Sequence, residues 1–86
     1  MNGQKAVRGV WRDEEKSSVQ FIDRTDGTMY MLTVHAPGAD LPHWTAQAEL
    51  LGPDYRQLSF SGLHHGGTTR DEAKVVAESV RTRLAA

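Results

Sequence analysis

The sequence predicts an α+β fold in which an antiparallel β-meander of four to five strands packs on one C-terminal helix, in two layers. Three observations predict it. Several short segments alternate apolar and polar residues with a period of two, turn-forming residues separate these segments, and apolar residues near the end of the chain recur at helical spacing. A chain of 86 residues is expected to form a single domain, 1–86, because domains usually contain about 100–200 residues.

Turn-forming residues divide the first two thirds of the chain into five expected strands. The turns are the charged run 12–16, the dipeptide Asp26-Gly27, the loop 36–42 and the tripeptide 52–54. Glycine adopts positive φ at little cost, so Asp26-Gly27 favours a two-residue hairpin. The strands are expected at residues 5–11, 17–24, 28–35, 43–51 and 55–61.

The turn positions also predict how the strands pair. A two-residue turn at Asp26-Gly27 places Phe21 opposite Leu32, and a hairpin with His35 opposite His43 continues the sheet. The large apolar side chains then share one face, and a shift of one residue would turn a strand over. The expected members of that face are Phe21, Leu32, Trp44 and Phe60, joined from the first strand by Val7 and Trp11.

A helix is expected over residues 70–84. Thr69 and Glu72 have the spacing of a capping box, in which each side chain bonds the backbone of the other. Acidic residues then lie near the positive end of the helix dipole and arginines near the negative end. One apolar stripe follows at helical spacing and should cover the apolar sheet face; it consists of Ala73, Val76, Ala77, Val80 and Leu84.

One helix covers only one face of the sheet, and the other face also carries apolar residues. We expect Ile22, Met29 and Met31 there, with Ile22 opposite Met31. An exposed apolar patch of this kind is typical of a surface that meets a protein partner or a second copy of the chain, and methionine suits adaptable surfaces. The alternatives are isolated surface residues or a sheet that curls over on itself.

The stretch before the helix is rich in glycine, threonine and histidine. His64 and His65 precede two glycines and two threonines that lead to the helix N-terminus, where free N–H groups favour anions. Arg70, Lys74 and Arg81 follow along one flank of the apolar stripe, from which they could contact phosphates. The alternatives are a plain connector with an N-cap and a solvated basic flank.

Composition and motifs argue against several function classes. Lys and Arg number 10 and Asp and Glu 11, a formal charge of −1, whereas general nucleic-acid binders are usually basic. Four histidines without cysteine do not suggest a zinc site, so neither a metal nor another cofactor is expected. No catalytic motif is found, and a domain this thin leaves little room for a pocket of about 300 Å³, so enzymatic activity is not expected.

The second half of the chain, residues 42–84, resembles the C-terminal half of double-stranded RNA-binding domains. Pro42 and an aromatic residue open an alternating strand that ends at Gly52, and the segment 67–74 is similar to the start of that family's helix. The resemblance implies phosphate contacts for Arg70 and Lys74. Asp71 stands where the family has a second basic residue, and the first 35 residues contain no helix. The strand layer followed by Thr69-x-x-Glu72-Ala73 is also similar to small antitoxins of the HicB type.

These observations lead to two expected functions. The first is a small non-enzymatic interaction module that uses the open sheet face and binds a protein partner or itself. The alternative is a domain that contacts nucleic acid, RNA in particular, through the helix N-terminus and the basic flank. No apolar run approaches the roughly 18 residues of a membrane span, and the N-terminal residues lack the apolar stretch of a signal peptide, so a cytoplasmic location is expected.

Overall fold

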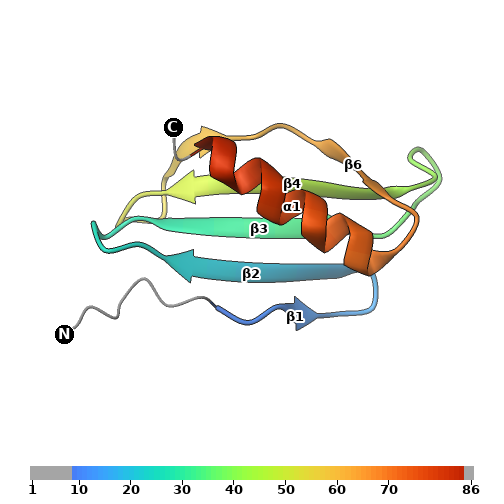
Figure 1. The fold of residues 1–86 in the computed structure, drawn as a ribbon, viewed down its shortest axis with the longest axis horizontal. Coiled ribbons are helices and arrows are strands. Elements are labelled where there is room, and N and C mark those ends of the chain that lie inside the picture. The colour runs from blue at the N-terminus through green and yellow to red at the C-terminus, as the bar shows by residue number, and fades with distance from the viewer. Residues whose placement is uncertain (1–8, 85–86) are drawn as a thin grey trace.

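The computed structural model describes residues 9–84, and it confirms an α+β fold with a C-terminal helix on an antiparallel sheet. Figure 1 shows the helix running diagonally across one face of the sheet. The elements are β1 (Arg12–Asp13), β2 (Ser17–Asp23), β3 (Met29–His35), β4 (Trp44–Leu51), β5 (Gln57–Phe60), β6 (His64–Gly67) and α1 (Arg70–Leu84). Residues 5–8 of the first expected strand lie outside the described residues.

The strands form one sheet in the order β1-β2-β3-β4-β5, and β6 pairs with β4 as well. The expected fifth strand, 55–61, is the shorter β5, and an unexpected strand, β6, follows it; the two pair with different halves of β4. The break lies at Gly62, whose φ is 82°, and Ser61 bridges it: Ala48 N–H donates to Ser61 Oγ at 2.9 Å. The expectation of a plain connector before the helix was wrong, because part of it, His64–Gly67, is a strand.

The pairing of β2 with β3 differs from the prediction by one residue. Phe21 lies opposite Met31, and Ile22 lies opposite Tyr30. The connection contains five residues instead of two, because Arg24 N–H donates to Thr28 O at 2.9 Å and closes a longer turn. A shift of one residue turns every side chain of β2 to the other face.

This shift corrects two placements made from the sequence. Ile22 was expected on the open face, but it is 7% exposed and lies in the core beneath the helix. Phe21 was expected in that core, but it is 40% exposed on the opposite face. The same face of β2 that carries Ile22 also buries Ser18 and Gln20, two polar residues.

The register of β3 with β4 differs from the prediction by two residues, which preserves the face of every side chain. Val34 pairs with Ala46 and Leu32 with Ala48, so the two alanines still face the helix. Phe60 pairs with Glu49 and lies on the open face, 47% exposed, so its expected place in the core was wrong.

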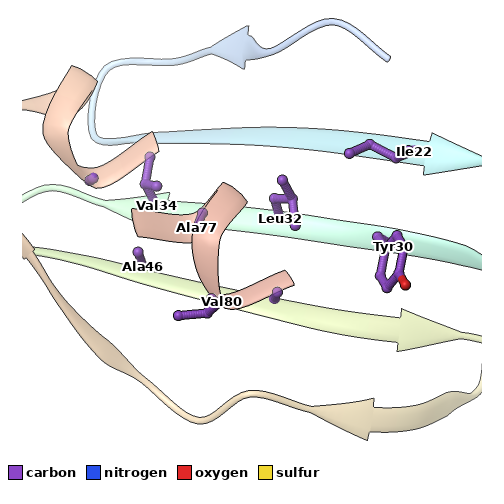
Figure 2. Close-up of a cluster of buried hydrophobic side chains, with 9 residues drawn as sticks. Ile22, Tyr30, Leu32, Val34, Ala46, Ala77 and Val80 are labelled. Atoms are coloured by element: carbon purple, nitrogen blue, oxygen red, sulfur yellow. The ribbon is translucent and has the colours of Figure 1, made fainter. Parts of the chain in front are cut away.

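The core fills the space between α1 and strands β2–β4 (Figure 2). Ala73, Ala77 and Val80 of the helix are buried, as the apolar stripe predicts. Small residues allow a close approach: a Cβ added at Gly66 would lie 2.9 Å from the Cβ of Ala73. The buried cluster consists of Ile22, Tyr30, Leu32, Val34, Ala46, Ala48, Ala73, Ala77 and Val80, and Trp11, Trp44, Leu50, Val76 and Leu84 pack against it.

The capping box at the start of α1 is confirmed. Glu72 N–H donates to Thr69 Oγ1 at 3.1 Å, and Thr69 N–H donates to Glu72 Oε1 at 3.2 Å. Thr68 N–H also donates to Glu72 Oε1, at 2.7 Å, and these bonds hold the pKa of Glu72 below its usual range. Within residues 9–84, no helix is long and apolar enough to cross a membrane.

Candidate functional site

The sheet face opposite α1, called the open face below, carries a row of four residues that cross the sheet side by side. Phe21 of β2 pairs with Met31 of β3, Met31 with Glu49 of β4, and Glu49 with Phe60 of β5. We call these four residues the open-face row. The two phenylalanines are exposed and Met31 is half-buried. Phe21 and Met31 therefore lie next to each other without cover from the helix, and Glu49 separates them from Phe60.

Neighbouring positions extend this apolar surface along the strands. Met29 lies two residues from Met31 on the same face, next to the buried Leu51 of β4. Val19 lies two residues from Phe21 in the other direction and is half-buried. Beyond β2, Val10 is 80% exposed. The open face thus carries several apolar side chains that lie near one another.

Two opposite charges lie on the open face, one on each side of the pair formed by Phe21 and Met31. Arg12 pairs with Val19 and so lies on the open face at the β1 side of the sheet. Glu49 lies on the other side, in β4, where Gln47 Nε2 donates to its Oε2 at 3.3 Å. A groove of about 270 Å³ lies here between residues 9–12 and β2, and it is lined by Gly9, Val10, Arg12, Val19 and Phe21.

The residues predicted as an interface patch are only partly brought together. Met29 and Met31 lie on the open face as expected, whereas Ile22 lies under the helix. Phe21 and Phe60, which the sequence interpretation placed in the core, take part in the surface instead. An Asp-Gly dipeptide is compatible with turns of more than one length, so the sequence carries no clear signal for the side on which Phe21 lies.

The first two basic residues of the helix make contacts within the chain. Arg70 Nη1 donates to Ser18 Oγ at 2.8 Å and to Ser17 O at 3.1 Å, and its guanidinium lies 5.1 Å from the centre of the Trp44 ring. Lys74 Nζ lies 2.9 Å from Asp13 Oδ1. The hydrogen bond from Lys74, followed by that from Ser18, holds the pKa of Asp13 below its usual range.

Arg81 is also directed toward its own domain. Its guanidinium lies 5.3 Å from the centre of the Tyr30 ring, and Nη2 lies 3.5 Å from Glu78 Oε1. The side chains of Arg70, Lys74 and Arg81 are each about a quarter exposed or less. A phosphate at any of these positions would therefore compete with contacts that already hold the helix to the sheet.

The histidines lie near one end of β4 and bond mainly to the backbone. The rings of His43 and His65 are stacked with centroids 3.7 Å apart, and Gly67 N–H donates to His65 Nδ1 at 3.1 Å. His64 Nε2 lies 3.0 Å from Ser61 O. His35 of β3 pairs with Thr45, whose other neighbour is His65, and it lines a shallow cavity of about 310 Å³ beside the 36–42 loop. Among residues 9–84, no three metal-binding side chains are grouped as an ion would require.

The chain was compared with protein-family models, with curated proteins and with solved structures, and no match was found in any of the three.

Proposed function

We propose that this protein is a small non-enzymatic interaction module that binds a protein partner through the open face. The observation that carries the proposal is the open-face row, in which Phe21 lies beside Met31, and Phe60 follows beyond Glu49, on the sheet face that no other described element covers. Aromatic and methionine side chains are enriched at the buried centres of protein interfaces. Large contiguous apolar patches on soluble proteins are commonly binding sites.

The packing of the other face supports the same proposal. The helix buries Ala73, Ala77 and Val80 on one side of the sheet, and the core there also contains Leu32, Val34 and two alanines without any contribution from the open face. The open-face phenylalanines therefore add little to the core of the monomer. Their exposure costs solubility, and burial against a partner would recover the hydrophobic free energy.

Site-specific photo-crosslinking in the source cell tests this proposal. A benzophenone side chain replaces Phe21 in one variant and Phe60 in another, and Val75 in a control variant, because Val75 is 69% exposed on the outer side of the helix. We expect discrete adducts from positions 21 and 60 that the additional change Met31→Glu weakens. Equal labelling from position 75, or no adduct from the sheet positions, would contradict the proposal.

The alternative function, contact with nucleic acid, has weaker support. It requires Arg70, Lys74 and Arg81 to leave Ser18, Asp13 and the Tyr30 ring, respectively, or to contact phosphate while bound there. A gel-shift titration with double-stranded RNA at low and moderate salt tests it. Affinity that falls steeply with salt would support this alternative, since phosphate contacts release counterions. The absence of a shift at low salt would remove it.

A further inference from the structure

We infer that the partner of the open face is a second copy of this chain, packed face to face about a two-fold axis parallel to the strands. This inference rests on the proposed function, because it names the partner of the same surface. Homodimers with two-fold symmetry are the commonest oligomers, and their interfaces must complement themselves. The arrangement of charge and apolar side chains on the open face meets that condition.

The apolar side chains match under this symmetry. An axis that passes between β2 and β3 exchanges these two strands between the copies. Phe21 then lies against Met31 of the second copy, and Met31 lies against the second copy's Phe21, because the two residues are level in the sheet. The interface would thus have aromatic-to-methionine contacts at its centre, where such side chains contribute most.

The charges match as well. The same axis exchanges β1 with β4. Arg12 pairs with Val19, Val19 with Thr33 and Thr33 with Gln47, so these residues lie in one row across the sheet. Arg12 would therefore face Gln47 of the second copy, which is hydrogen-bonded to Glu49. Glu49 lies two residues further along β4, about 7 Å away, within the reach of an arginine side chain. Two symmetry-related pairs of Arg12 with Glu49 follow from one axis.

Other arrangements of two copies are less favourable. A two-fold axis perpendicular to the strands and through the open-face row would place Glu49 against the second copy's Glu49. Two like charges brought together in a partly dehydrated interface repel each other. The position of Glu49 therefore disfavours this perpendicular axis relative to the one parallel to the strands.

The size of the face predicts a weak dimer. Strands lie about 4.8 Å apart and rise about 3.3 Å per residue, so the overlap of β1–β4, four strands wide and at most seven residues long, covers at most about 440 Å² per copy. Two copies would bury about 900 Å², somewhat below the roughly 1,000 Å² of a stable specific interface, as in a weak or transient complex. We expect dimerisation that depends on concentration in the micromolar range or above.

Sedimentation equilibrium of the full chain over a concentration series tests the inference. The wild type should be a mixture of monomer and dimer, and Phe21→Glu should be monomeric while its circular dichroism spectrum stays that of the wild type. Val75→Glu is the matched control on the outer side of the helix and should dimerise as the wild type does. Dimerisation by Phe21→Glu, or a strictly monomeric wild type at about 1 mM, would overturn the inference.

Charge reversal tests the axis. Arg12→Glu and Glu49→Arg should each lower the association constant about tenfold, because each reversal disrupts two symmetry-related pairs. The double variant restores opposite charges across the interface and should associate within about twofold of the wild type. A double variant as weak as the single variants would overturn the proposed axis.

The photo-crosslinking masses separate this inference from the proposed function. Adducts at twice the mass of the chain from position 21 support the second copy, because the proposed axis leaves β5 and Phe60 outside the overlap. Adducts of another mass, or adducts within one chain to residues 1–8, together with a monomeric wild type, overturn it. If the adducts have another mass, the proposed function stands, since the open face still binds a protein.

Discussion

Lys74 and Asp13 join the C-terminal helix to the first strand, with 2.9 Å between Nζ and Oδ1. Lys74 Nζ also lies over the Trp11 ring, 5.4 Å from its centre, so the lysine side chain covers part of that ring. Asp13 in turn accepts a hydrogen bond from Ser18 Oγ at 2.7 Å. Together these contacts hold the short strand β1 in place on the sheet.

The ion pair predicts a dependence of stability on pH. The pKa of Asp13 is lowered in the folded state from an ordinary value of 3.8, so its carboxylate stabilises the fold above that value. This contribution is lost as the pH falls through the lower, folded pKa. Asp13→Asn should therefore be less stable than the wild type at pH 7, and the two stabilities should converge as the pH falls below about 4.

Urea denaturation between pH 2 and pH 7 measures this difference, and Asp40→Asn in the exposed loop is the control. Some acid sensitivity should remain in Asp13→Asn. The pKa values of Asp26 and Glu72 are also lowered, by bonds from Thr28 and from the Thr68 N–H, respectively. A difference between Asp13→Asn and the wild type that stays constant over the whole range would contradict the role of the ion pair.

The register of β2 predicts losses of stability that differ in size at two adjacent residues. Ile22→Ala should lower the free energy of unfolding by about 2–5 kcal/mol, since it leaves a cavity beneath the helix. Phe21→Ala should lower it by about 1 kcal/mol or less, since its side chain is 40% exposed. Chemical denaturation at low protein concentration, where association does not contribute, measures both. The reverse order of effects would mean that Phe21 faces the core.

The close approach of α1 to β6 predicts an effect of one methyl group. A Cβ at Gly66 would lie 2.9 Å from Ala73 Cβ and 3.0 Å from Trp44 O, so Gly66→Ala should cost about 1–3 kcal/mol. Gly38→Ala is the control, because no atom lies within 4 Å of the added Cβ, and its stability should change by about 0.5 kcal/mol or less. Thermal unfolding of the two variants compares them directly, and equal stabilities would argue against tight packing at Gly66.

The capping box predicts a loss of stability at the start of the helix. Thr69→Ala removes the acceptor for Glu72 N–H and should cost about 1 kcal/mol. Thr82→Ala, in the last turn, removes only a bond to Ser79 O from an exposed side chain, and alanine favours the helix there. We expect the second variant to unfold at or slightly above the wild-type denaturant midpoint. If Thr82→Ala lost as much stability as Thr69→Ala, the loss would reflect the removal of any threonine from the helix and not the removal of its N-cap.

The sequence predicted the elements whose signals are local. The capping residues Thr69 and Glu72 and the apolar stripe lie within one helix, so spacing alone identified them. The alternation in β3 and β4 likewise predicted correctly that Leu32 and Ala48 face the helix, since an error of two residues in register leaves the faces unchanged.

The features that the sequence did not predict depend on geometry at turns and on distant contacts. The length of the turn around Asp26 and Gly27 decides the face of Phe21, and the same dipeptide fits a two-residue and a five-residue connection. The inward contacts of Arg70 and Lys74 depend on Asp13 and Ser18, which lie far away in the sequence. Helical spacing places such cations on a flank but does not identify what they touch.

The break at Gly62 has a consequence for how the molecule avoids polymerising. The outermost strands are short: β1 has two residues, and β5 and β6 have four each, separated by a glycine with φ of 82°. Segments of six or seven residues are needed to seed a cross-β stack, and an interrupted border offers no straight row of free amide and carbonyl groups of that length. Growth of fibrils by strand addition is thereby obstructed at both borders of the described sheet.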